Sequence, residues 1–267
     1  MAAVPPGSGH PAEVASRQTP VAYEPADVAR LAASAMTLDR LDARVSVCRA
    51  CPRLVEWRER VADERRASFA AEEYWGRPVP SWGPARARVL IVGLAPAAHG
   101  GNRTGRIFTG DRSGDWLYAA LYRAGLAAQP TSTHAGDGQR LIDTRIAAAV
   151  HCAPPANKPT PAERDACRPW LERDLELVAP TLRVIAVLGG FGWAAVFPAL
   201  AAVGYELPPR RASFGHGVEV PLGESGPVVL GCYHPSQQNT FTGKLTEPMI
   251  DAVFSRAAEL ARAPGTG

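Results

Sequence analysis

The chain has 267 residues, of which 46% are apolar and 21% are charged, a composition typical of a globular protein with a sizeable core. Its net charge of +3 is too small to indicate a nucleic-acid-binding protein through the overall field, although it leaves room for a local basic face. The sequence shows neither a secretory signal nor a run of about 18 apolar residues, so we expect a cytosolic protein with no membrane partner.

The chain divides into two predicted parts. Residues 1–22 are rich in alanine, proline, glycine and serine without periodicity, which predicts a disordered extension. Residues 23–262 carry regular apolar patterns and no internal repeat, which predicts one domain. At its start, apolar side chains recur at helical spacing and predict a helix over residues 26–47.

Four short apolar runs are the strand candidates: residues 88–93, 144–150, 183–188 and 228–233. Each run is mostly apolar rather than alternating, which is typical of strands covered on both faces. Between and after them, helices are expected from Ser113 to Gly125, from the capping-box pattern at Thr160 onward, and over residues 248–261. The alternation predicts an α/β fold, a three-layer α/β/α sandwich with a central four-stranded parallel sheet.

Five cysteines in a reducing compartment favour metal ligation or plain packing over disulfides. Cys48 and Cys51 form a Cys-x-x-Cys pair, and Cys152 and Cys167 are separated by 14 residues. Four thiolates suit one metal centre, but their spacing does not separate zinc from an iron–sulfur cluster. Ordinary burial and a redox Cys-x-x-Cys are the alternatives, although the pair lies near the end of a predicted helix rather than at a helix start. Cys232 is expected in the core.

A loop of distinctive composition follows each strand candidate. The loops begin at Gly93, Cys152, Gly189 and His234. Ligands of an open parallel sheet bind beyond the carboxyl ends of its strands, so we expect these loops to meet at one cleft.

The loop motifs resemble those of family 5 (type b) uracil-DNA glycosylases, over about residues 41–260. The matching runs are Gly-Leu-Ala-Pro-Ala-Ala-His-Gly (93–100), Asn-Arg-Thr-Gly-Arg-x-Phe-Thr-Gly-Asp (102–111), Cys-Ala-Pro-Pro-x-Asn-Lys-Pro-Thr (152–160) and His-Pro-Ser (234–236). The resemblance implies a four-stranded parallel sheet between helices. It also implies a hydrolase that removes uracil, and hypoxanthine and other deaminated or damaged bases, from double-stranded DNA to leave an abasic site, acting as a monomer. A [4Fe-4S] cluster bound by Cys48, Cys51, Cys152 and Cys167 is implied as well.

Cleavage of an N-glycosidic bond creates positive charge on the sugar and negative charge on the base, so the site needs an anion and a hydrogen-bond donor. Asp111 is the carboxylate of the first motif and is expected to orient water and stabilise the sugar; its alternative role is a helix cap. His234 resembles the family histidine that donates to the uracil O2, and a packed structural histidine is its alternative. Asn157 is expected to hold the water or the base, with a turn asparagine as the alternative.

The base pocket is expected to contain Phe108, stacked on the flipped base, and the backbone of Gly93 and Ala95. Glycosylases specific for uracil carry a polar residue early in the first motif. Here residues 94–97 contain neither a carboxylate nor an amide, which predicts a less discriminating pocket.

Contacts to the DNA are expected from residues that flank the cleft: Arg103, Arg106, Arg112, Ser236, Gln238, Asn239 and Lys244. Simple solvation is the alternative for the arginines. A wedge into the duplex is expected from Gln237, Gln238, Asn239 or Phe241. A rival function is a non-cleaving iron–sulfur protein that binds DNA damage or senses redox state. A nucleotide-binding module is less favoured, because no P-loop or Gly-x-Gly-x-x-Gly signature is present.

Overall fold

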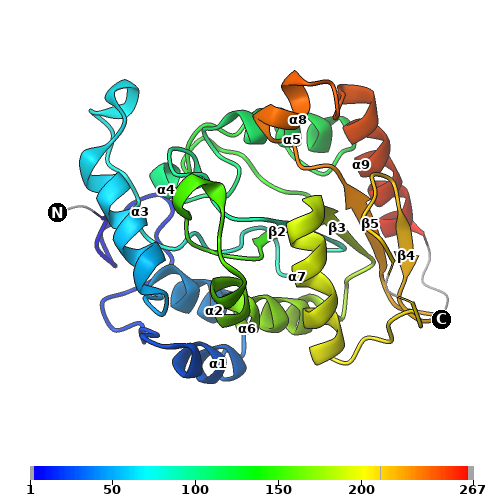
Figure 1. Cartoon of the computed structure of the whole chain (residues 1–267), viewed down its shortest axis with the longest axis horizontal. Coiled ribbons are helices and arrows are strands. Elements are labelled where there is room, and N and C mark those ends of the chain that lie inside the picture. The colour runs from blue at the N-terminus through cyan, green and yellow to red at the C-terminus, as the bar shows by residue number, and fades with distance from the viewer. Residues whose placement is uncertain (1–2, 211, 264–267) are drawn as a thin grey trace.

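A five-stranded sheet lies at the centre of the computed structural model, which describes residues 3–210 and 212–263 (Figure 1). The strands are β1 (Val89–Gly93), β2 (Thr144–Ala148), β3 (Val184–Leu188), β4 (Glu219–Pro221) and β5 (Val228–Cys232), in the order β2-β1-β3-β5-β4. Four strands are parallel and correspond to the four predicted runs, whereas β4 pairs antiparallel with β5. The predicted count of four missed β4, because a three-residue edge strand with one buried side chain leaves little pattern.

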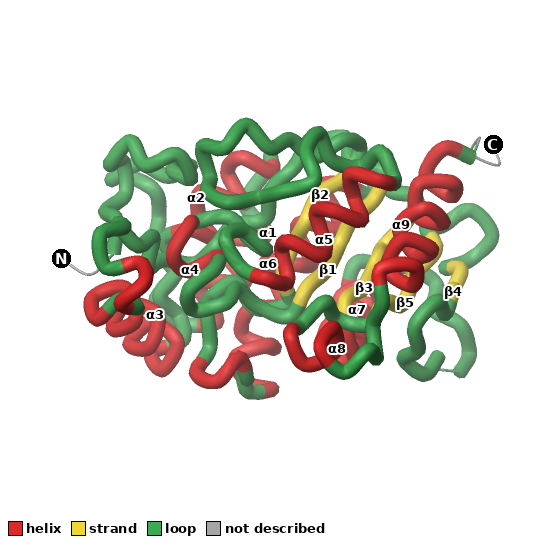
Figure 2. The backbone as a smooth tube through the Cα atoms, turned by 90° about the horizontal axis from the view of Figure 1, so that it is seen from above, coloured by secondary structure: helices red, strands yellow, loops and turns green. Residues whose placement is uncertain are grey.

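Helices cover both faces of the sheet and complete the predicted three-layer α/β/α sandwich. The longer helices are α1 (Pro25–Ala33), α2 (Leu38–Ser46), α3 (Pro52–Glu64), α5 (Arg112–Arg123), α6 (Pro161–Val178), α7 (Gly189–Ala202) and α9 (Glu247–Arg262). Shorter ones are α4 (Gly101–Thr104) and α8 (Gln237–Phe241). Figure 2 shows α5 and α9 in front of the strands, with α6 and α7 behind them. No helix in the described ranges has the length and apolarity needed to span a bilayer.

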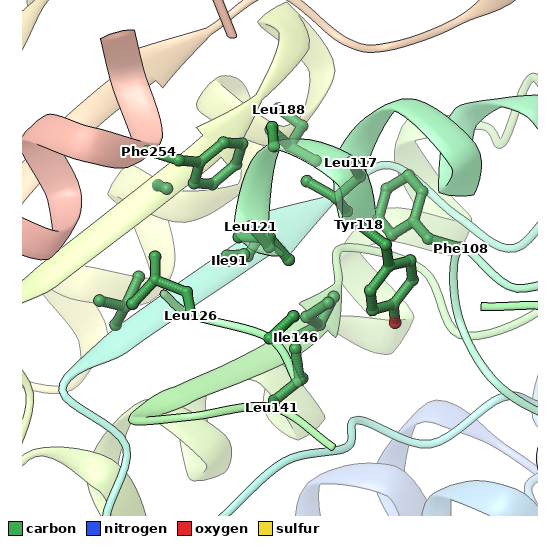
Figure 3. Packing of buried hydrophobic residues seen from close by; sticks show 14 of the residues in the cluster. Ile91, Phe108, Leu117, Tyr118, Leu121, Leu126, Leu141, Ile146, Leu188 and Phe254 are labelled. Atoms are coloured by element: carbon green, nitrogen blue, oxygen red, sulfur yellow. The ribbon is translucent and has the colours of Figure 1, made fainter. Parts of the chain in front are cut away.

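Side chains of each parallel strand alternate between two cores. Ile91 of β1 packs with the residues of α5 and α9, whereas Val92 packs with those of α6 and α7. The first of these cores includes Leu117, Leu121 and Phe254, which are fully buried (Figure 3). Burial on both faces explains why the strand sequences are apolar throughout rather than alternating.

The helix predicted over residues 26–47 is two helices, α1 and α2. The break occurs where the Thr37 hydroxyl accepts a hydrogen bond from the Arg40 N–H and caps α2. Two further helices among the longer ones, and the short α4 and α8, were not predicted. Proline at the first position starts α3, and α7 begins at Gly189, where a loop was expected. The apolar residues of α7 surround the helix and therefore give no amphipathic signal.

The structure also differs from the expected disordered extension at residues 3–22. Val4 is buried, and its N–H donates to the Trp75 carbonyl at 3.1 Å. The Glu13 carboxylate accepts two hydrogen bonds, at 3.0 and 2.9 Å, from the guanidinium of the buried Arg77. These contacts join residues more than 60 positions apart, so the local composition of the segment does not reveal them.

Candidate active site

A cleft of about 590 Å³ lies beyond the carboxyl ends of β1, β2 and β5. Its walls come from three of the loops that the sequence analysis singled out. The lining residues are Leu94, Ala95, Ala97, Phe108, Asp111, Arg112, Ser113, Ala156, Asn157, Lys158, His234, Ser236, Gln237 and Gln238. The structure therefore brings together Asp111, Asn157 and His234, which are more than 120 residues apart at the extremes.

Asp111 serves as a helix cap and as a wall of the cleft. Its Oδ1 accepts a hydrogen bond from the Gly114 N–H at 2.9 Å and so caps α5, the alternative role given to this residue from the sequence. Its Oδ2 lies so close to Gly100 that a Cβ atom on residue 100 would come within 2.0 Å of this oxygen. Burial raises the pKa of Asp111 to about 6. One carboxylate thus holds the helix start and adds a titratable group to the cleft.

His234 follows β5 and is neutral at physiological pH. Burial lowers the pKa of its imidazole to about 4. Its backbone carbonyl accepts from Asn239 Nδ2 at 2.9 Å, and the preceding Tyr233 N–H donates to His216 Nδ1 at 3.1 Å. The backbone is therefore held on both sides of the histidine. Among the described residues no hydrogen bond engages the ring nitrogens, so a ligand in the cleft can use them.

Phe108 lies between the core and the cleft. It is 6% exposed, packs near Leu117 and Tyr118 in the core (Figure 3), and has a left-handed backbone with φ of 52°. Its ring lies against Gly93, where a Cβ would come within 2.9 Å of two ring carbons. The ring centroids of Phe108 and His234 are 5.8 Å apart. Glycine at the end of β1 thus provides the space for an aromatic wall.

Asn157 stands in an exposed left-handed turn at the mouth of the cleft. Ala156 and Asn157 have φ values of 52° and 56°, a conformation that asparagine tolerates better than most residues. The next residue, Lys158, also lines the cleft and was not singled out from the sequence. Its place beside Asn157 in the third motif was the available signal.

The prediction that Arg103 and Arg106 contact DNA is wrong, because both side chains are buried. Arg103 pairs with Glu72 and donates to the carbonyls of His99 and Gly110. Arg106 donates to Asp137 at 2.7 Å and to Ser132 Oγ at 2.7 Å. These bonds use the guanidinium groups inside the protein, where they fix the long loop that carries Phe108.

The other expected DNA contacts lie at or near the cleft. Arg112, Ser236 and Gln238 line it, and the Ser236 hydroxyl caps α8. Asn239 instead uses its side chain to hold the His234 carbonyl. Lys244 is exposed, with its ammonium 5.1 Å from the centre of the Tyr233 ring.

The four cysteines of the predicted metal site line a second, small cavity. Cys48 follows the end of α2, as expected, and Cys51 is the N-cap of α3, so the Cys-x-x-Cys pair lies at the junction of the two helices. In residues 3–210 and 212–263 no three metal-binding side chains are arranged around a single ion. The thiols instead surround the cavity together with Arg58 and Trp170. Four thiols around one cavity form a donor set that suits either a zinc ion or an iron–sulfur cluster.

The pKa values of three of these thiols are also those expected of metal ligands rather than of redox-active cysteines. Burial and the proximity of the other sulfurs raise the pKa of Cys48 to about 11, that of Cys51 to about 12, and that of Cys167 well above its usual range. Reactive redox cysteines require the opposite shift. Metal ions deprotonate such thiols on binding, so the cavity fits an iron–sulfur cluster better than a dithiol redox pair.

Comparison with known proteins identifies the family. Residues 80–258 match the model described as the Uracil DNA glycosylase superfamily. The chain belongs to the uracil-DNA glycosylase superfamily. It is 57% identical over 258 residues to a type-5 uracil-DNA glycosylase of Mycobacterium bovis, covering 97% of this chain and 94% of that protein. A protein of the same name from Thermus thermophilus is 49% identical, covering 81% of this chain and 95% of that protein. Another, from Pyrobaculum aerophilum, is 44% identical, covering 87% of this chain and 97% of that protein.

The resemblance to family 5 is thereby confirmed. In this uracil-DNA glycosylase superfamily member, the matched segment contains the whole cleft from Leu94 to Gln238. Cys48 and Cys51 lie before that segment, whereas Cys152 and Cys167 lie within it. The cysteine cavity therefore joins the shared fold to the preceding helical region.

Proposed function

We propose that this protein is a hydrolase that removes uracil from DNA by cleaving the N-glycosidic bond, leaving an abasic site. One observation carries the proposal: a single cleft contains a buried carboxylate, a neutral imidazole and an aromatic wall, from Asp111, His234 and Phe108. The name printed for its relatives, type-5 uracil-DNA glycosylase, supports uracil as the substrate.

The two titratable groups match the two charges of the reaction. Asp111, with a pKa of about 6, is ionised at pH 7 to 8 and stabilises the positive charge that develops on the sugar. It orients a water molecule whose oxygen bonds to the sugar carbon, and it accepts the water proton. The electron pair of the broken bond leaves with the base. His234, neutral above a pKa of about 4, donates a hydrogen bond to the base carbonyl where negative charge collects. The departing base takes up one proton at nitrogen from solvent, and Asp111 releases the proton it accepted, so the two parts of one water molecule end on the sugar and on the base.

The cleft wall supports a broader range of bases than uracil. Leu94, Ala95 and Ala97 contribute apolar surface where a polar side chain would select one base. A site with few fixed hydrogen-bonding groups rejects analogues weakly. Hypoxanthine and other deaminated bases are accordingly proposed as further substrates.

The test of this function is release of the base from synthetic duplexes. We expect the purified protein to release uracil from a G·U mismatch, leaving a strand that breaks at the abasic site in alkali, and to release hypoxanthine more slowly. An undamaged duplex of the same sequence is the control. Tight binding of the G·U duplex without release would instead support the non-cleaving damage-binding protein.

Access to a base within a duplex requires that the base be flipped out, and Phe241 is the proposed wedge. Its ring is 67% exposed at the end of α8, whose first turn lines the cleft. The Arg112 guanidinium lies 4.6 Å from the ring centre and holds the ring beside the cleft. An exposed aromatic ring can stack in the gap left by the flipped base.

Replacing Phe241 with alanine is expected to slow uracil release from a duplex by about tenfold, equal to about 1.4 kcal/mol, and to leave release from single-stranded DNA unchanged. Single-turnover rates on both substrates measure this difference. Tyr122→Ala is the matched control, since Tyr122 is an exposed aromatic residue that does not line the cleft. Equal slowing on both substrates would exclude the wedge.

We further propose that Cys48, Cys51, Cys152 and Cys167 bind a [4Fe-4S] cluster. When bound, the cluster would supply four metal–thiolate bonds that join the α2–α3 junction to α6 and to the loop after β2. Besides the thiols, the buried Arg58 supports this assignment, because its Nε has no hydrogen-bond partner among the described residues. An orphaned buried donor is costly, and an anionic cluster would offset that cost.

A further inference from the structure

Arg58 is a fully buried arginine beside the cysteine cavity. It is 1% exposed and lies on α3, two helical turns after Cys51 and on the same face. Arginine is almost never buried without a partner that offsets the cost of removing its charge from water. The nearest carboxylate, on Glu59, is 3.9 Å away and partly exposed, so a carboxylate does not account for the burial.

The guanidinium connects two of the four cysteines. Its Nη1 lies 2.9 Å from the sulfur of Cys152, and its Nη2 donates to the carbonyl of Cys48 at 3.0 Å. The backbone of Arg58 is held in turn, since its carbonyl accepts from Asn102 Nδ2 at 3.1 Å. A cation is therefore fixed against one sulfur of the cavity, with little freedom to move away.

We infer that Arg58 sets the reduction potential of the cluster through its hydrogen bond to the Cys152 sulfur. The inference rests on the cofactor proposed above. A one-electron reduction adds negative charge to the cluster, and a nearby cation that donates to a ligand sulfur stabilises that charge. Arg58 thus raises the potential and disfavours loss of an electron by the cluster. It is a positioning residue that acts through Cys152.

The test is a redox titration of the whole protein against a low-potential chemical reductant, followed by the electron paramagnetic resonance signal. In Arg58→Met, the ratio of reduced to oxidised cluster at a fixed potential is expected to fall about tenfold, a shift of about 59 mV for one electron. Arg60→Met is the matched control, because Arg60 is a partly exposed arginine on the same helix that lies over the Trp57 ring and does not line the cavity. The reduction potential of the cluster in Arg60→Met is expected to equal that of the wild type.

The outcomes separate this inference from the proposed cofactor. If the purified wild-type protein contains neither iron nor sulfide, both the proposed cluster and the proposed role of Arg58 are overturned. A cluster whose potential is the same in wild type and Arg58→Met would overturn the role of Arg58 alone. If the methionine variant does not retain its cluster, Arg58→Lys keeps a charge but loses the forked donor, and an intermediate potential is expected; an unchanged potential would overturn the inference.

A measurement on the wild type avoids the variants altogether. In protein carrying ¹⁵N-labelled arginine, the reduced cluster is expected to show a weak ¹⁵N coupling in electron spin-echo spectra. That coupling requires an arginine N–H bonded to a cluster ligand, and Arg58 is the arginine that donates to a cysteine sulfur among the described residues. Absence of the coupling would overturn the inference.

Discussion

Replacing Asp111 with asparagine is expected to slow uracil release by about 10²–10⁴-fold, the usual contribution of a positioned acid or base, while α5 remains capped. Asparagine is as good an N-cap as aspartate, so its amide oxygen can accept the Gly114 hydrogen bond. The substitution therefore removes the negative charge and leaves the local structure. Single-turnover release from a G·U duplex measures the effect, and thermal unfolding verifies that the fold is intact.

The pH dependence of the rate of uracil release tests whether the Asp111 carboxylate causes this loss of activity. Its pKa is raised to about 6, and only the ionised form stabilises the sugar cation. The wild-type rate is therefore expected to rise with pH through about 6 and to fall below it, whereas the Asp111→Asn rate should not vary in this window. His234, with a pKa of about 4, stays neutral there. Asp39→Asn, at an exposed aspartate in the first turn of α2 away from the cleft, is the control and should keep the wild-type profile. A fast Asp111→Asn enzyme would contradict the mechanism.

Replacing Arg145 with methionine is expected to lower the free energy of unfolding by about 3–5 kcal/mol. The Arg145 guanidinium on β2 donates at 2.7 Å to both carboxylate oxygens of Asp42 and at 2.7 Å to Asp174 Oδ1. All three side chains are nearly inaccessible to water. Loss of the cation leaves two negative charges buried without a partner, in a network that joins β2 to α2 and α6.

Urea unfolding measures this effect. Arg183→Met, at an exposed arginine just before β3, is the control and is expected to change stability by no more than about 0.5 kcal/mol. Equal stability of Arg145→Met and wild type would show that the buried network contributes nothing. Restoration of stability in a variant that also replaces Asp42 and Asp174 with asparagine would confirm that uncompensated charge is the cause.

The four parallel strands and the loops that form the cleft could be predicted from the order of the amino acids alone. Parallel strands buried on both faces must be apolar throughout, so residues 89–93 and 184–188 are recognisable without a structure. The capping box at Thr160 is equally local, because its two hydrogen bonds join residues three positions apart. The residues that line the cleft follow the strands directly, and a parallel sheet places all such loops at one edge.

Which charged residues face the cleft and which are buried depends on contacts between distant parts of the chain. Arg103 and Arg106 belong to the same loop as Asp111, but their partners, Glu72 and Asp137, lie far from them along the chain. The packing of residues 3–22 and the contact of Arg58 with Cys152 depend on equally distant pairs. A local sequence pattern indicates the backbone conformation of a segment and which side of a helix or strand is apolar. The partner of a charge depends on how distant segments meet, because burial of the charge is offset only in the folded chain.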